Sequence, residues 1–169
     1  MGEQSLPAAR AASITVDISD IQVSDDPGVV LVTYALGSCI AVVIHDPVRI
    51  AGGMIHYMLP LSSTSPKKAL DCPAMFADTG VPLLFQKMYD LGCRKEDLVV
   101  KVAGGGALYD DKGTFQIGRR NYTMLRKLFW KNGVLIAAED VGGPRSRTVR
   151  LYVGSGRTAV RSGGAEEDL

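Results

Sequence analysis

The residues best suited to chemistry in this chain are a cysteine, a histidine and a threonine within the stretch from Thr33 to His56. Cys39 is the candidate nucleophile, because a thiol becomes a strong nucleophile once a base removes its proton. His56 is the candidate base, since imidazole exchanges protons near neutral pH. The Thr33 hydroxyl or carbonyl could orient that imidazole as the third member of a triad. Together these residue types indicate cysteine-dependent hydrolysis.

Strand pairing is what would bring the thiol to the imidazole. Residues 40–45 and 50–55 are short runs rich in β-branched residues, typical of two strands of a hairpin. If residues 46–49 close that hairpin, Cys39 lies directly opposite His56. Directly opposed residues have Cβ atoms about 4.5–5.5 Å apart. We therefore expect His56 to share the proton of Cys39 and to lower the pKa of its thiol.

The other histidine and the other cysteines do not suit this role. His45 would share a strand face with Cys39, but the strand between them would separate the two by roughly 20 Å. Cys72 and Cys93 have no histidine in a matching element and are expected to be small buried residues. Three cysteines without a CxxC motif and only two histidines predict no metal site, no disulfide framework and no cofactor.

Glycines surround the candidate nucleophile. Gly37 and Ser38 precede Cys39 and would leave backbone N–H groups near the sulfur, where an oxyanion hole could form. The triple glycine at 104–106 follows a predicted strand but lacks both GxGxxG and a GK[ST] ending. It therefore predicts close backbone packing rather than phosphate binding.

Composition limits the class of partner. The chain has 169 residues, is 46% hydrophobic, and carries 19 Lys and Arg against 18 Asp and Glu, a net charge of +1. A chain of this size buries roughly 68–70% of its unfolded surface, enough for a stable core. The balanced charge and the absence of a basic run argue against nucleic acid or an anionic membrane as partner. With no recognisable leader and no long apolar run, we expect no membrane insertion and a cytoplasmic location.

The elements that must position these residues favour an α+β fold with mixed sheet, because predicted strands outnumber helices and often follow one another directly. We expect a flexible N-terminal arm at 1–17, a single domain at 18–162 and an acidic C-terminal tail that frays at 163–169. The stretch 60–73 predicts a long loop of the kind that borders a site. Strands are predicted at 21–23, 29–33, 40–45, 50–59, 98–102, 134–138, 148–153 and 158–160, and helices at 75–91 and 121–130.

Longer runs of sequence resemble a known family. LGSCIAVVIHD, IAGGMIHYMLP, KVAGGG, IGRRN and AEDVGGPRSRTVRLYVGSGR are similar, in order and spacing, to the CheD family of chemoreceptor glutamine deamidases, over roughly residues 19–161. The resemblance implies that Cys39, His56 and Thr33 form a triad that hydrolyses glutamine side-chain amides of methyl-accepting chemotaxis receptors. A thioester intermediate would yield glutamate and ammonia. It also implies a mixed β-sandwich with helices packed outside, similar to the deamidase domain of cytotoxic necrotizing factor toxins.

Other functions stay open beside this one. Members of the family also bind CheC, a phosphatase of the chemotaxis response regulator, so the chain could be a binding module that regulates a CheC-type phosphatase. A thiolate and a base would also serve a receptor methyl ester, and a reactive Cys39 could sense oxidation instead. Arg119 stands where similar proteins often carry an acidic residue, which affects any charge-based contact there. Asn121 is expected to cap the following helix or to take part in recognition.

Overall fold

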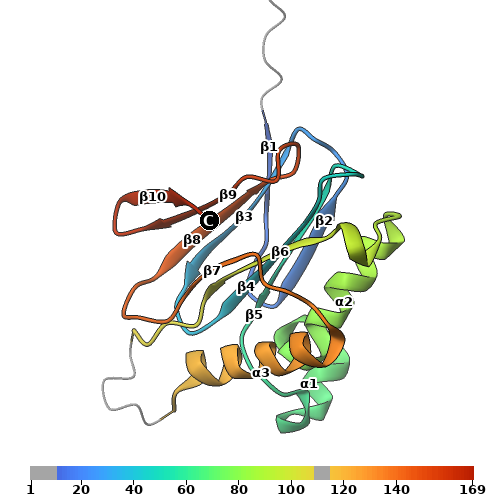
Figure 1. Cartoon of the computed structure of the whole chain (residues 1–169). Helices are drawn as coiled ribbons and strands as arrows, with labels where there is room; N and C mark the ends of the chain where they lie inside the picture. Colours follow the sequence, from blue (N-terminus) through green and yellow to red (C-terminus); the bar gives the residue numbers. More distant parts are fainter. Residues whose placement is uncertain (1–10, 109–114) are drawn as a thin grey trace, which may run out of the picture.

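The computed structural model describes residues 11–108 and 115–169, which build two stacked β-sheets and a layer of helices (Figure 1). The first sheet has the order β1-β3-β8-β9-β10 and the second the order β2-β5-β4-β6-β7. β1 pairs in parallel with β3 and β7 with β6, while the other pairs are antiparallel. The α+β class with mixed sheet is thereby confirmed. The first sheet contains β1 (Ala12–Thr15), β3 (Val29–Leu36), β8 (Arg147–Tyr152), β9 (Thr158–Ser162) and β10 (Ala165–Asp168), and the second β2 (Asp20–Ser24), β4 (Ile40–Asp46), β5 (Ala51–Tyr57), β6 (Val99–Gly104) and β7 (Ala138–Val141).

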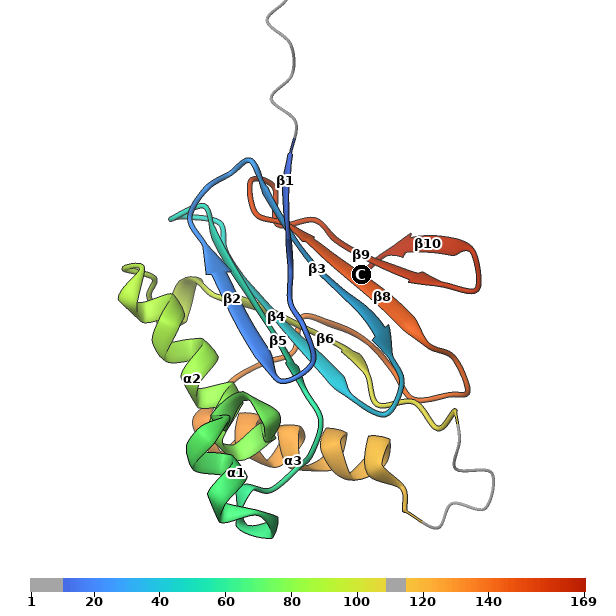
Figure 2. The same ribbon diagram turned by 180° about the vertical axis from the view of Figure 1, so that it is seen from behind.

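The helices lie on the side of the second sheet that faces away from the first (Figure 2). α3 stops at Gly133, whose φ of 62° is the left-handed conformation that glycine adopts most easily. In the part of the chain that the structure describes, no helix is long and apolar enough to cross a membrane. The helices are α1 (Pro66–Asp71), α2 (Ala77–Asp90) and α3 (Ile117–Asn132), and the 3-10 helices are η1 (Ser62–Thr64), η2 (Pro73–Met75) and η3 (Lys95–Asp97).

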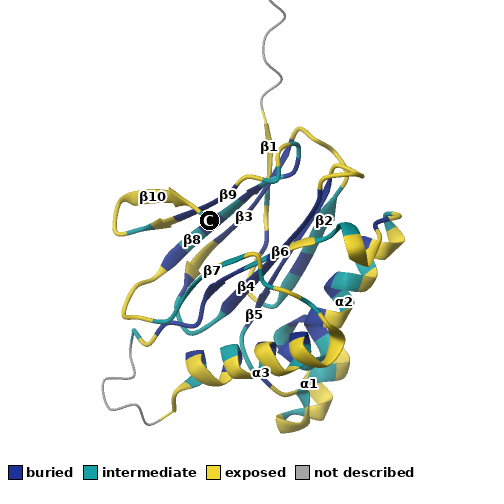
Figure 3. Cartoon of the chain, in the orientation of Figure 1, coloured by how far each residue is buried: buried dark blue, intermediate teal, exposed yellow. Residues whose placement is uncertain are grey.

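Strand β4 lies at the centre of the molecule and is buried on both faces (Figure 3). Because successive side chains of a strand point to opposite faces, its residues contribute alternately to two cores. Ile40, Val42 and Ile44 pack in the core beneath the helices. Ala41 and Val43 pack in the core between the two sheets. The end of β4 next to Cys39 is therefore held from both sides.

Both chain ends are more ordered than predicted where the structure describes them. The predicted arm is wrong for residues 12–15, which form β1 along β3, and for Val16, which is buried; residues 1–10 lie outside the described part. The predicted fraying of residues 163–169 is also wrong, since Ala165–Asp168 pairs with β9. Both segments are short edge strands, and their order comes from pairing with a neighbour rather than from their own sequence pattern.

Several elements also differ from the sequence prediction. The expected loop at 60–73 contains η1 and the short helix α1, which begins at Pro66, a residue well suited to the first helical turn. The strand expected at 134–138 is wrong, because pairing with β6 begins only at Ala138. The helix expected at 121–130 begins four residues earlier, at Ile117.

Candidate active site

Two of the three candidate residues are in contact at the end of the sandwich where the chain crosses from one sheet to the other, and the third lies in the crossing itself. Thr33 lies on β3 of the first sheet and His56 on β5 of the second, and Cys39 lies in the turn that joins β3 to β4. Thr33 Oγ1 and His56 Nδ1 are 2.8 Å apart, and both residues are buried. A single hydrogen bond therefore links the two sheets at this point.

The partners of Thr33 determine which nitrogen of His56 carries the proton. The Thr33 hydroxyl donates to the carbonyl oxygen of Val16, at 2.7 Å. Since a hydroxyl has one proton, its oxygen must accept at the second contact, and His56 Nδ1–H is the donor. In the neutral ring Nε2 then carries the lone pair. Nε2 is buried and has no hydrogen-bond partner among the described residues, so it is available as a base.

Cys39 is a diagonal neighbour of His56 rather than its direct partner, so the predicted hairpin register is wrong by two residues. His56 pairs with Ala41, and Ile40 pairs with Tyr57. A shift of two residues keeps every side chain on its predicted face, whereas a shift of one would reverse them all. Diagonal neighbours are about 7–8 Å apart, within reach of long side chains. Cys39 and His56 consequently still share a face.

The cause of the shift is the turn between the two strands. Asp46 remains in β4 and pairs with Ala51, so the connection consists of residues 47–50. The buried Asp46 carboxylate accepts hydrogen bonds from the N–H groups of Val48 and Arg49, at 2.8 and 3.0 Å. An Asp side chain that binds the backbone in this way stabilises a turn directly after itself.

Burial keeps both members of the pair neutral. It lowers the pKa of His56 to about 4, with only the carboxylate of Asp17 acting in the opposite direction. Burial also raises the pKa of the Cys39 thiol, although the residue's own backbone N–H opposes this change. The prediction that His56 lowers the pKa of Cys39 is therefore wrong. At neutral pH the site contains a thiol and a neutral imidazole.

Three consecutive carbonyl groups anchor the turn that carries Cys39. The carbonyl of Gly37 accepts from the N–H of Gly106 and that of Cys39 from the N–H of Gly105, both at 2.8 Å. The carbonyl of Ser38 accepts from the side-chain amide of Asn121, at 3.0 Å. The N–H groups of residues 37–39 have no backbone acceptor among the described residues. The turn thus has a fixed backbone with donors left over beside the sulfur.

Glycines at the end of β6 and in α3 are required by this close packing. A Cβ on Gly104 would lie 2.2 Å from the carbonyl oxygen of Cys39, and the φ of Gly104 is +113°. A Cβ on Gly118 of α3 would lie 2.4 Å from the carbonyl oxygen of Gly105. The prediction that the triple glycine serves close backbone packing is confirmed.

Asn121 does not cap α3, because the helix begins before it. Its buried side chain instead donates to the carbonyls of Ser38, at 3.0 Å, and Met58, at 2.8 Å. These residues lie next to Cys39 and close to His56, so Asn121 ties the ends of β4 and β5 to α3. Its spacing of four from the buried Leu125 is the sequence signal for a buried polar residue on the inner face of the helix.

Cys39 lines an open pocket of about 630 Å³. Much of the wall is glycine backbone, and most of the remainder is apolar. Such a wall suits an uncharged polar group such as an amide, which needs backbone donors and little else. The complete lining comprises Ala35, Gly37, Ser38, Cys39, Gly105, Gly106, Ala107, Leu108, Phe115, Gln116, Ile117, Gly118, Arg119, Gly142 and Gly143.

A buried arginine that the sequence analysis missed supports the far wall of this pocket. The Arg147 guanidinium makes two 3.0 Å bonds to the Asp140 carboxylate and donates to the carbonyl of Gly142 at 2.7 Å. This arginine holds the pKa of Asp140 below its usual value. The neighbouring Gly143 carbonyl accepts from the N–H of Ala107, so the loop is held from both sides.

The remaining histidine and cysteines lie outside the site. His45 Nε2 contacts the carbonyl oxygen of Val153 at 2.8 Å, at the opposite end of β4. Cys93 is buried, and Cys72 donates to the carbonyl of Ser19 at 3.4 Å. Over residues 11–108 and 115–169, no group of three or more His, Cys, Asp or Glu side chains could hold a metal ion.

Comparison with known proteins gives matches over most of the chain. Residues 58–162 match the family model described as CheD chemotactic sensory transduction. A probable chemoreceptor glutamine deamidase CheD 2 of Anaeromyxobacter dehalogenans is 55% identical, over 89% of this chain and 94% of the relative. The chemoreceptor glutamine deamidase CheD of Thermotoga maritima is 38% identical, over 91% and 94% respectively. The crystal structure of a hypothetical protein, YfiH of Bacillus licheniformis, matches with 15% identity and a TM-score of 0.38, covering 72% of this chain and 49% of that one.

Proposed function

The chain belongs to the CheD family and acts as a chemoreceptor glutamine deamidase, and we propose that Cys39, His56 and Thr33 carry out its reaction. The support for this assignment is the hydrogen-bonded chain from Val16 through Thr33 to His56. It leaves Nε2 of the imidazole as an unpartnered base on the strand face shared with Cys39.

In the first half of the proposed reaction, Cys39 Sγ attacks the side-chain carbonyl carbon of a glutamine while His56 Nε2 takes the thiol proton. Because both groups are neutral at rest, the proton moves as the carbon–sulfur bond forms rather than beforehand. The oxyanion of the tetrahedral intermediate accepts hydrogen bonds from the N–H groups of Gly37 and Ser38. The carbon–nitrogen bond then breaks, His56 returns its proton to the leaving nitrogen, and ammonia departs.

In the second half, water hydrolyses the resulting thioester. His56 removes a proton from the water as its oxygen attacks the thioester carbonyl. The carbon–sulfur bond breaks, the sulfur regains a proton from the imidazolium, and glutamate is released. Thr33 holds the ring in one tautomer throughout, because its hydroxyl accepts from Nδ1–H in both the neutral and the protonated ring.

The test is conversion of glutamine to glutamate in a cytoplasmic chemoreceptor fragment, followed by the small mass increase that accompanies replacement of an amide by an acid. Cys39→Ala should abolish conversion, whereas Cys72→Ser, a change at another half-buried free cysteine, should leave it intact. If Cys39→Ala still converts the receptor, Cys39 is not the nucleophile. A receptor fragment with methyl esters at the same sites would show whether the thiol also hydrolyses esters.

A second proposed function is regulation of a CheC-type phosphatase by binding. Trp130 and Leu135 support it, because large apolar side chains exposed at 86% and 87% near the end of α3 are typical of a surface that contacts another protein. Phosphatase regulation that persists in Cys39→Ala would show that binding and deamidation are separate activities. Loss of both activities in that variant would contradict the separation.

We also infer that the two-sheet architecture is shared with the deamidase domain of cytotoxic necrotizing factor toxins, and that the protein acts in the cytoplasm. Superposition of Thr33, Cys39 and His56 on the corresponding residues of such a toxin domain tests the first inference. Cell fractionation tests the second.

A further inference from the structure

We propose that a basic groove along helix α3, next to the catalytic pocket, binds an acidic helical segment of the substrate beside the target glutamine. This inference rests on the proposed deamidase function and adds how the substrate is recognised. Its basis is the continuity of two hollows, the charge of α3 and the spacing of the residues that line it.

The groove is an open hollow of about 250 Å³ that adjoins the catalytic pocket. The two share Gln116 and Arg119, which line both. A substrate segment lying in the groove would therefore pass Gln116 and Arg119, which border the pocket that Cys39 lines. The groove is lined by Pro60, Leu61, Gln116, Arg119, Arg120, Thr123, Met124 and Lys127.

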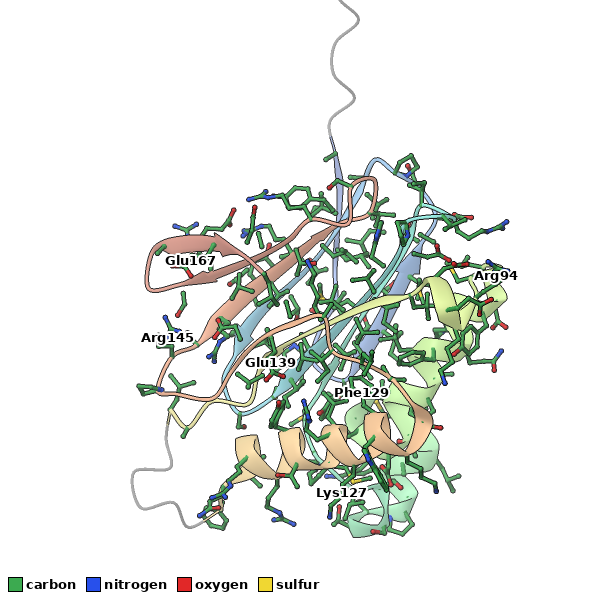
Figure 4. The ribbon with its side chains drawn as sticks, viewed as in Figure 1. Arg94, Lys127, Phe129, Glu139, Arg145 and Glu167 are labelled. Carbon is green, nitrogen blue, oxygen red and sulfur yellow. The ribbon has the colours of Figure 1, made fainter. Side chains whose placement is uncertain are left out.

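The spacing of these residues shows that the groove runs along the helix. Arg120, Thr123 and Lys127 follow one another at intervals of three and four, which places them on one face of α3. Lys127 lies on the side of α3 turned away from the sheets, whereas Phe129 lies on the side next to them (Figure 4). From Gln116 to Lys127 the groove extends about 16 Å at the usual helical rise, or about three turns of a substrate helix.

The charge of α3 specifies the sign of the partner. The helix contains Arg119, Arg120, Arg126, Lys127 and Lys131 and no acidic residue, although the whole chain has a net charge of only +1. In the described residues, no carboxylate forms an ion pair with Arg119, Arg120 or Lys127. The opposite wall is apolar, with Leu61 37% exposed. Cations that have no carboxylate partner among the described residues, along an apolar wall, fit an amphipathic helix that carries carboxylates on its polar face.

The experiment measures binding separately from turnover. The probe is a fluorescent helical peptide with one glutamine and with glutamates four and seven residues away, and the control peptide has lysines in place of the glutamates. Binding to Cys39→Ala protein is followed by anisotropy at low and high salt. Arg120→Glu with Lys127→Glu reverses two groove cations. Arg126→Glu with Lys131→Glu makes the same charge change on the same helix outside the groove.

We expect the acidic peptide to bind at low salt and to weaken as salt rises, and the lysine peptide not to bind. The groove variant should bind the acidic peptide at least about tenfold more weakly, because two attractive charge pairs become repulsive. The control variant should bind like the parent. Equal binding by the two variants, or binding of the lysine peptide, would contradict the proposal that the groove binds an acidic segment. Circular dichroism of both variants tests that they fold.

The experiment gives different results if the proposed groove is wrong and if the proposed deamidase reaction is wrong. If the wild-type chain with Cys39 intact converts the peptide glutamine and the groove variant converts it with the same kcat/KM, recognition lies elsewhere while the deamidase function stands. If the peptide binds through the groove but is never converted, the groove stands and the reaction assignment fails.

Discussion

The ionisation of the proposed catalytic pair, Cys39 and His56, follows from burial of each residue. His56 is 1% exposed, and transfer of an imidazolium into such a site costs free energy unless a counter-charge compensates. The carboxylate of Asp17 provides only part of that compensation, so the pKa falls to about 4. A base with so low a pKa stays unprotonated over the whole physiological range. The imidazole is therefore neutral at any pH at which the cell operates.

The first prediction concerns stability against pH. The unfolded chain, with an ordinary histidine pKa near 6.5, binds a proton at His56 that the folded chain does not bind until about pH 4. Stability should therefore fall as pH decreases through this window, by about 2 kcal/mol between pH 7 and pH 4.5 from this residue alone. Urea unfolding of the wild type and His56→Gln at both pH values measures the difference. Parallel pH profiles for the two chains would contradict the assignment.

A second prediction concerns the tautomer. Thr33→Val preserves the shape of the side chain but removes the acceptor for His56 Nδ1–H. The tautomer with its proton on Nδ1 and a free lone pair on Nε2 is then no longer favoured, and kcat should fall by about 100-fold. Thr33→Ser should retain most of the activity. Nitrogen NMR of the His56 ring reads the tautomer directly, and an unchanged spectrum in the valine variant would count against this role.

The elements of the fold position the site through their ends. Cys39 precedes β4 and His56 is close to the end of β5, and both ends are anchored by the Asn121 amide from α3. The glycines after β6 approach the Cys39 turn closely enough to hydrogen-bond its carbonyls. Helix α3 and the glycines after β6 thereby hold the backbone at Cys39 in place, and the Cys39 thiol does not contribute to this anchoring.

The third prediction tests that close approach. Gly104→Ala would place a Cβ against the carbonyl of Cys39, whereas Gly164→Ala, also at positive φ but outside the pocket, meets nothing within 4 Å. The first variant should lose activity and about 1–3 kcal/mol of stability from steric displacement in addition to backbone strain. The second should lose only the stability due to strain. Deamidation rate and thermal unfolding measure both variants, and equal losses would argue against the packing role of Gly104.

At the scale of the whole molecule, the site exists only because two sheets are stacked. Thr33 belongs to one sheet and His56 to the other. The first sheet also contributes β1, which leads directly into Val16, whose carbonyl accepts from Thr33. An edge strand near the start of the chain therefore completes the hydrogen-bonded chain that orients His56.

The fourth prediction follows from that strand. A chain that begins at Asp17 lacks β1 and the Val16 carbonyl, whereas one that begins at Ala11 keeps every contact of β1. The shorter chain should lose about 2 kcal/mol of stability from Val16 alone and should show a reduced kcat. Adding Thr33→Val to the shorter chain should reduce kcat little further, because both changes break the same hydrogen-bonded chain from Val16 through Thr33 to His56. Additive losses in kcat would contradict the shared path.

The sequence alone was sufficient for the strand faces on which Cys39 and His56 lie. The face of a strand on which a side chain lies follows from the alternation of successive residues. A register error of two residues therefore leaves the faces unchanged. The close packing of the triple glycine was equally predictable, because the segment lacks any phosphate-binding pattern. These inferences needed only local rules.

Only the tertiary structure decided the hairpin register, the roles of Val16, Asn121 and Arg147, and the neutral state of the Cys39 and His56 pair. Each depends on groups far apart in sequence. A buried Asp46 moved the turn by one residue, and stacking of two sheets removed water from the imidazole. Hydrogen bonding and desolvation act through space, so a pattern along the chain predicts which side chains share a face but not what surrounds them.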